Sequence, residues 1–201
     1  MNINYKKLTQ LFVGMAASGI VAAQSGGYSS SIEEIKIDAS TTIEEPSDSK
    51  EMEAVLLTTQ FKSAGRGSLY KIDLSSECEI RRFTRGVSEN QKNNHSQLGA
   101  SIVVWAEIDG QVIPISPNED PDETGRLPLC AQLEWDEASN PNRDDLNVAA
   151  GYSWMASNIP RGKHQLELKA RFYAFSITKE NAGGGVMARV GKRMLTVNQF
   201  K

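Results

Sequence analysis

Apolar and polar residues alternate between residues 164 and 172, and this alternation is the strongest structural signal in the sequence. Successive side chains of a β-strand point to opposite faces, so residues two apart share a face. One face would carry Leu166, Leu168, Ala170 and Phe172, and the other Gln165, Glu167, Lys169 and Arg171. The pattern predicts a strand with one buried and one solvated face, as in an antiparallel β domain.

The same period of two recurs upstream, with hardly any helical periodicity. It predicts further strands at 54–61, 70–80, 102–108, 111–115, 129–135, 152–156 and 186–197. Seven to eight strands separated by long polar loops favour two packed antiparallel sheets. We therefore expect residues 54–201 to form an all-β, two-layer β-sandwich of the jelly-roll or immunoglobulin-like kind.

One hairpin is specified in detail. Asp109-Gly110 separates two apolar runs, and this dipeptide favours a two-residue turn of the primed types. The register would pair Ile108 with Gln111, Ala106 with Ile113 and Val104 with Ile115. Pro114 has no N–H to donate, so its strand is expected at a sheet edge.

The N-terminal segment has the features of a secretory signal. Lys6 and Lys7 precede a mostly apolar run of small residues, and Val21-Ala22-Ala23 would suit cleavage before Gln24. The alternative is a retained amphipathic helix that serves as an anchor in a larger assembly. The run is too short to predict a membrane span, and the mature chain would have none.

Residues 24–53 are rich in Ser, Thr and acidic residues, and this composition predicts a disordered acidic linker. Ile32, Ile35 and Ile37 are the exception. They would form either a short edge strand or an apolar patch between residues 31 and 38.

The charge balance argues against a nucleic-acid partner. The 201 residues include 22 basic and 25 acidic ones, a formal net charge of −3, and no basic stripe is present.

Two cysteines, Cys78 and Cys130, fit a single disulfide in an exported protein. Two separate buried thiols are the alternative. Metal binding is disfavoured because no histidine accompanies them.

An acidic loop offers a candidate calcium site. Asn118, Asp120 and Asp122 alternate along the loop, and calcium takes several oxygen ligands. The loop lacks the glycine and the distal glutamate of an EF-hand, and Asn140, Asn142 and Asp144 in the next polar loop share this shortfall. We favour a solvated acidic loop over a calcium site, and no other cofactor is expected.

Catalytic motifs are weak. His164 would be either a general base or a structural histidine bonded to a nearby carbonyl at the strand entry. The structural role is favoured because no nucleophile motif accompanies it. The stretch 185–193 differs from a phosphate loop in glycine spacing and lacks its Ser or Thr.

Aromatic residues give a further candidate. Trp105, Trp135 and Trp154, with Tyr152 and Tyr173, would form a sugar-stacking platform or fill the core, and the core is favoured. Asn94-His95-Ser96 matches a glycosylation acceptor, which is a frequent chance match.

The stretch from Tyr152 to Arg171 has an aromatic strand, a Pro160-Arg161-Gly162 turn and then His164 with alternating aliphatics. Together with a closing strand at 193–197, it resembles the terminal hairpins of exported bacterial sandwich domains and phage fibre domains. The resemblance implies a non-enzymatic β-sandwich outside the cytoplasm and carries over no catalytic residue.

From these observations we expect a periplasmic or secreted, non-enzymatic interaction or structural module. Its partners would be a protein or a surface glycan, and exposed strand edges would allow a homo-oligomer. The alternatives are a calcium-assisted carbohydrate-binding module and a phage virion or fibre component that keeps its N-terminus.

Overall fold

The computed structural model describes residues 27–40, 47–85, 96–116, 120, 125–135, 145–178 and 183–200. Ten strands form within them, where seven to eight were predicted, and no helix in these ranges could cross a membrane. The strands are β1 (Tyr28–Ser31), β2 (Ile35–Ser40), β3 (Ser47–Ser63), β4 (Leu69–Arg85), β5 (Ser96–Ile108), β6 (Gln111–Val112), β7 (Leu127–Trp135), β8 (Asp145–Ser157), β9 (Gly162–Thr178) and β10 (Gly183–Phe200).

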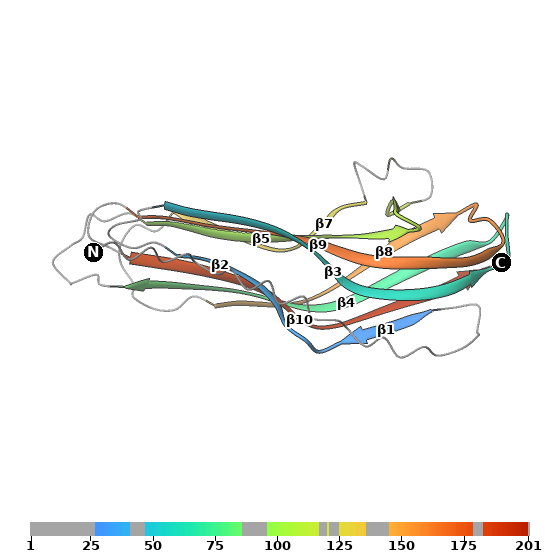
Figure 1. Ribbon diagram of the computed structural model, residues 1–201, viewed down its shortest axis with the longest axis horizontal. Helices are drawn as coiled ribbons and strands as arrows, with labels where there is room; N and C mark the ends of the chain where they lie inside the picture. The colour runs from blue at the N-terminus through green and yellow to red at the C-terminus, as the bar shows by residue number, and fades with distance from the viewer. Residues whose placement is uncertain are drawn as a thin grey trace, which may run out of the picture.

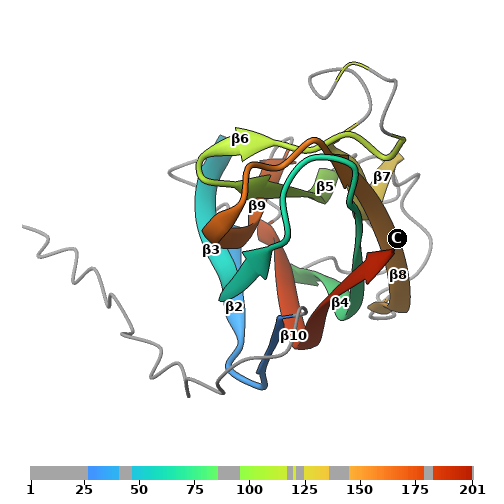
Figure 2. The ribbon, with the colours of Figure 1, turned by 90° about the vertical axis from the view of Figure 1, so that its right-hand side faces the viewer.

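The strands form two antiparallel sheets that pack face to face (Figures 1 and 2). Sheet A has the order β10-β4-β8, and both β1 and β2 pair with the outer edge of β10. Sheet B has the order β3-β9-β5, and both β6 and β7 pair with β5. The predicted two-layer sandwich is confirmed.

The strand pairs are nested along the chain. β2 pairs with β10, β3 with β9, β4 with β8, and β5 with β7. This order describes one long antiparallel ribbon rolled into two sheets, which is a jelly roll. Of the two topologies expected from the sequence, the structure therefore has the first.

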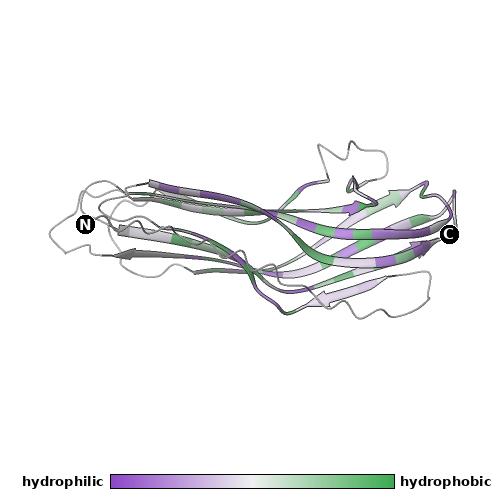
Figure 3. Ribbon diagram, in the orientation of Figure 1, coloured by the Kyte–Doolittle hydropathy of each residue, from purple (hydrophilic) through white to green (hydrophobic). Residues whose placement is uncertain are grey.

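Alternation builds the core, and hydrophilic and hydrophobic bands follow one another along the long strands (Figure 3). In β9, residues 166, 168, 170 and 172 are fully buried, while 167, 169 and 171 stand on the outer face. Burial of each large aliphatic or aromatic side chain contributes about 1.5–3 kcal/mol. The largest fully buried side chains are Trp154, Tyr70, Phe172, Ile72, Ile80 and Ile102.

A disulfide joins Cys78 of β4 to Cys130 of β7, so it links sheet A to sheet B. The two Cα atoms lie 6.3 Å apart, and both residues are buried. The predicted disulfide is confirmed. Cys78 faces inward by the alternation of β4, whereas Cys130 is buried next to Leu129 at the bulge in β7.

The Asp109-Gly110 hairpin is confirmed in part. Both turn residues have positive φ, 50° and 81°, and Ile108 pairs with Gln111 as predicted. β6 ends at Val112, however, and Val104 pairs with Leu127 of β7 instead of Ile115. Pro114 lies beyond the ladder, where its carbonyl accepts a hydrogen bond of 3.1 Å from Met155 N.

The segment 24–53 differs from the disordered linker expected from its composition. It contains β1, β2 and the start of β3, although residues 24–26 and 41–46 lie outside the described ranges. The short-strand alternative for Ile35 and Ile37 is confirmed, because these side chains and Ala39 face the core. This polar segment buries little apolar surface. Its backbone N–H and C=O groups instead form hydrogen bonds with β10 and β9.

Besides a bulge in β7, two β-bulges change the expected alternation in the described strands. One lies between Val55 and Leu57 of β3, so Leu56 and Leu57 are both buried while Val55 is 47% exposed. The other lies between Val190 and Arg193 of β10. The bulged β10 turns Arg193 inward, where its guanidinium donates to the carbonyls of Leu56, Glu33 and Gly191. Burial lowers the pKa of Arg193.

Candidate functional site

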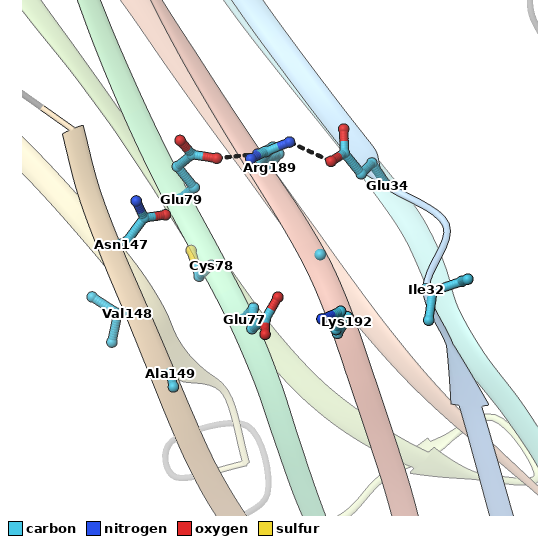
Figure 4. Close-up of a pocket in the computed structure, with 11 residues that line it drawn as sticks. Ile32, Glu34, Glu77, Cys78, Glu79, Asn147, Val148, Ala149, Arg189 and Lys192 are labelled. Atoms are coloured by element: carbon cyan, nitrogen blue, oxygen red, sulfur yellow. Dashed lines mark hydrogen bonds and ion pairs between the residues drawn. The ribbon is translucent and has the colours of Figure 1, made fainter. Parts of the chain in front are cut away.

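A polar groove of about 400 Å³ crosses the outer face of sheet A (Figure 4). Strands β4, β8 and β10 and the β1–β2 connection form it. The bulge in β10 places Gly191 and Lys192 together on this face. Its floor is low, since Ala149 and Gly191 carry little or no side chain. The lining residues are Ile32, Glu34, Glu77, Cys78, Glu79, Asn147, Val148, Ala149, Arg189, Gly191 and Lys192.

One end of the groove is an ion-pair network. The Arg189 guanidinium donates both to Glu79 on β4 and to Glu34 on the β1–β2 connection, as Figure 4 shows. Glu79 is 3% exposed and also accepts from Arg81. Burial opposes the charge on Arg189, but its hydrogen bonds to Glu34 and Glu79 outweigh burial and raise its pKa. These groups therefore hold the N-terminal segment against sheet A and are already satisfied.

The other end of the groove is open. Glu77 of β4 and Lys192 of β10 are both exposed and lie on neighbouring strands here (Figure 4). A Cβ added to Gly191 would lie 3.4 Å from the Glu77 carboxylate, so the space above this glycine is limited. The groove thus offers one carboxylate and one ammonium, without an aromatic surface.

An aromatic surface lies on the opposite sheet. Beyond Arg171, the outward positions of β9 change from charged to apolar, with Tyr173, Phe175 and Ile177 in one column. Tyr173 and Ile177 are 40% and 41% exposed, and Phe175 is half-buried. The Tyr173 and Phe175 rings are 5.8 Å apart between centroids and tilted by 40°. We call these three residues the aromatic column.

Polar and small residues flank the aromatic column on both sides. Tyr173 lies opposite Glu51 of β3 and Ser101 of β5, and Phe175 lies opposite Ser49 and Gly99. Directly opposed residues share one face of a sheet. The result is a flat apolar stripe bordered by a carboxylate and hydroxyls, with no side chain at Gly99 to stand above it.

A charge cluster closes one end of the aromatic column. Arg171 donates from Nε to Glu53 Oε1 at 2.9 Å and lies 3.2 Å from a carboxylate oxygen of Glu51. These hydrogen bonds and charges raise the pKa of Arg171. Glu51 is therefore both oriented by Arg171 and adjacent to Tyr173.

Of the proposed aromatic platform residues whose side chains the structure describes, Tyr173 alone is strongly exposed. Trp154 is fully buried, and its Nε1 donates to the Gly125 carbonyl at 2.8 Å. Trp105 is 3% exposed, donates to Glu107 at 2.8 Å, and has the Arg126 guanidinium 5.1 Å above its ring. Tyr152 is half-buried and donates to the Pro128 carbonyl, while the Trp135 side chain lies outside the description.

Phe175 and Ile177 were missed by the sequence analysis. The available signal was the continuation of the period-two pattern past Phe172, where residues 173, 175 and 177 replace charged residues on the outward face.

His164 has the structural role favoured from the sequence. Its Nδ1 lies 2.6 Å from Asp109 Oδ2, and its Nε2 lies 2.8 Å from the Pro160 carbonyl. Its ring also contacts Phe61, with 5.7 Å between centroids. Both ring nitrogens therefore face acceptors within the protein. A small hollow beside this pair is lined by Asp109, Gly110, Gln165 and Glu167.

The calcium candidates are only partly within the described structure. Asp120 is exposed, whereas Asn118, Asp122 and the second acidic loop lie outside the described residues, as does Asn94. In the ranges that the structure does describe, no three acidic, cysteine or histidine side chains converge as metal ligands. The stretch 185–193 is part of β10, so its assignment as strand and not as a phosphate loop is confirmed.

No protein-family model matches the chain, and no curated protein sequence does. Among solved structures, a lipoprotein of Bacteroides thetaiotaomicron is 12% identical, with a TM-score of 0.36, over 92% of this chain and 95% of that one. A CBM36 carbohydrate-binding module in complex with calcium and xylotriose is 10% identical, with a TM-score of 0.18, over 72% and 99%. A protein of infectious bursal disease virus is 8% identical, with a TM-score of 0.24, over 93% and 45%. The chain is weakly similar to each.

Proposed function

We propose that this protein is a non-enzymatic binding module that acts outside the cytoplasm and binds a polysaccharide chain along the aromatic column of sheet B. The observation that carries the proposal is the exposed Tyr173–Phe175 pair on a flat sheet face bordered by Glu51, Ser49 and Ser101.

The chemistry of the surface suits a sugar. A pyranose ring has an apolar face of C–H groups and a rim of hydroxyls. Aromatic rings offer an apolar surface with a negative face that favours such C–H groups, and their burial gives most of the binding energy. The Glu51 carboxylate and the serine hydroxyls stand where they would bond the rim.

A strand arrangement suits a polymer more than a single sugar. Residues 173, 175 and 177 follow one another along β9 at about 6.5–7 Å per pair of residues. The column therefore presents successive contacts in line, as an extended chain requires. The groove on sheet A lacks an aromatic surface and is the weaker candidate.

One observation supports a location outside the cytoplasm, and another supports a non-enzymatic role. Structural disulfides such as Cys78–Cys130 persist in oxidising compartments. The ring nitrogens of His164 are both used to join two turns, which leaves the strongest candidate base without a free nitrogen.

Affinity electrophoresis tests the ligand. The protein would be run through native gels containing a soluble β-glucan, a xylan or a mannan. Retardation by at least one polymer is expected, and Tyr173→Ala and Phe175→Ala should abolish it. Tyr28→Ala is the matched control, because Tyr28 is 59% exposed but belongs to β1 of sheet A. No retardation by any polymer, or equal retardation of all variants, would contradict the proposal.

The intact mass of the native protein tests the location. We expect the mass of a chain that begins at Gln24, and we expect this mass to rise by one hydrogen per cysteine on reduction. The mass of a chain that begins at Met1 and has free thiols would favour an assembly or virion component instead.

A further inference from the structure

Among the described residues, one edge of strand β8 is unpaired over part of its length. In the part of the chain that the structure describes, β8 pairs only with β4, through an unbroken register from Asp145 to Ser157. The C-terminal part of its other edge is covered, because Met155 N donates to the Pro114 carbonyl at 3.1 Å and Tyr152 donates to the Pro128 carbonyl. Within the described residues, no other element bonds the backbone from 147 to 151.

The register shows which backbone groups point outward. Met155 N points away from β4, toward Pro114. Alternate residues of an antiparallel strand direct N–H and C=O to the same side. Asn147, Ala149 and Gly151 therefore present their backbone groups to the open edge, and all three are exposed.

Residues 146–153 of this edge lack the features that prevent strand pairing. Sheet edges are commonly protected by charges, proline or bulges. β3 carries Asp48, Lys50, Glu51 and Glu53, and β7 carries Pro128 and a bulge. Residues 146–153, Leu-Asn-Val-Ala-Ala-Gly-Tyr-Ser, contain neither a charge nor a proline.

We propose that β8 is a dimer interface, where it pairs antiparallel with β8 of a second copy of this chain. The segment is complementary to itself, because a neutral strand brings no like charges together across a two-fold axis. A register centred on Ala149 places Asn147 opposite Gly151 of the second copy, where the missing side chain leaves room for the amide. About six backbone hydrogen bonds would form between the three outward residues of each copy.

The symmetry has a consequence for the proposed ligand. Two identical antiparallel strands in one sheet are related by an axis perpendicular to that sheet. Sheet A would be continuous through the dimer, and the two B sheets would lie on the same side of it. Both aromatic columns would then face one surface, and a polymer could engage both with a gain in avidity. The pairing of β8 does not itself depend on the ligand.

Light scattering over a range of protein concentrations tests the interface. A concentration-dependent dimer is expected. Ala149→Pro should convert it to a monomer, because the N–H that is lost serves the open edge and not the β4 ladder. Ala149→Ser keeps the N–H and should remain dimeric. Far-UV circular dichroism would check that each variant folds.

Cysteine cross-linking gives an answer that does not depend on the proline variant. Asn147→Cys, Ala149→Cys and Gly151→Cys would be oxidised separately, and cross-linking should be strongest for Ala149→Cys. Lys192→Cys is the control, since Lys192 is exposed on β10, two strands away from the edge. A monomer at every concentration, or a dimer without cross-links on β8, would overturn the proposal whether or not a polysaccharide binds.

Discussion

His164 and Asp109 lie 55 residues apart in the chain and are joined by a hydrogen bond of 2.6 Å between Nδ1 and Oδ2. The other oxygen of the same carboxylate accepts from Gln165 N at 2.9 Å, and His164 Nε2 faces the Pro160 carbonyl. The pair thus ties the Asp109-Gly110 turn to the turn that precedes β9. Since both ring nitrogens face acceptors, the protonated imidazole is the form that satisfies both contacts.

This pair predicts a pH dependence of stability. The hydrogen bond to Asp109 raises the pKa of His164 above 6.5, against a smaller effect of burial. The same bond lowers the pKa of Asp109 below 3.8. The contribution of His164 to folding stability is complete below pH 6.5 and is lost as the pH rises through the pKa of His164 in the folded protein. The contribution of Asp109 is complete above pH 3.8 and is lost as the pH falls through the pKa of Asp109 in the folded protein.

Denaturant unfolding of the wild type and His164→Gln across this range measures the effect. The stability difference should be largest between pH 3.8 and 6.5 and should shrink toward higher pH. If the free energies of unfolding of the two proteins differed by the same amount at every pH, the protonation of this pair would not be coupled to folding.

The disulfide predicts a large loss on reduction. Cys78 and Cys130 are 52 residues apart. On the chain-entropy model, closing a loop of this length lowers the entropy of the unfolded chain and so stabilises the fold by about 4 kcal/mol. Denaturant unfolding with and without a reductant should show a loss of this order. The double variant Cys78→Ala/Cys130→Ala should be insensitive to the reductant, and a wild type equally insensitive would count against a structural bond.

Arg193 predicts a second structural dependence. Its buried guanidinium satisfies carbonyls on β3, on β10 and on the β1–β2 connection. Arg193→Met would leave these acceptors without a donor and should cost about 2–4 kcal/mol. Arg193→Lys should also destabilise, because a single ammonium cannot reproduce the planar fork. Lys192→Met, at the exposed neighbour, should change stability little in the same thermal melts.

Glu79 and Glu77 form a matched pair on one face of β4. Glu79 is 3% exposed and bonds two arginines, whereas Glu77 is exposed. Glu79→Gln should cost about 3 kcal/mol, because Arg189 loses its buried counter-charge. Glu77→Gln should be close to neutral in urea unfolding. Equal effects of the two substitutions would indicate that the Arg189 network is not stabilising.

The acidic loop remains a prediction from the sequence. A solvated loop at Asn118, Asp120 and Asp122 should leave the melting temperature unchanged in millimolar calcium. A calcium-dependent rise that a chelator reverses, and that Asp120→Asn reduces, would instead support a calcium site.

Much of the fold follows from local sequence pattern. The alternation in β9 and the Asp109-Gly110 turn are both local, so a sequence shows them directly. The N-terminal strands are different. Ser29, Ser30 and Ser31 carry no apolar signal, and they pair with β10 because its edge is available in the folded chain. Strand order likewise depends on distant pairings such as Tyr28 with Thr196.

The candidate site was harder to predict for a related reason. Tyr173 and the tryptophans are equally aromatic in the sequence, but only their place on a strand relative to the core decides exposure. Trp154 shares a face with core residues, whereas Tyr173 shares a face with Glu51. The outward side of Tyr173 follows from the alternation along β9, but its neighbours across the sheet follow only from the register between strands.

The antiparallel pairing of β1 with β10 also determines how the domain would respond to tension. Gly27 O accepts a hydrogen bond from Val197 N, so the start of β1 lies beside the C-terminal end of β10. A force pulling residues 27 and 200 apart would load the hydrogen bonds of β1 one pair at a time, and then those of β2. This is the unzipping geometry of a hairpin, in which bonds break in sequence and not together. Under mechanical load the N-terminal strands would therefore peel from β10 first.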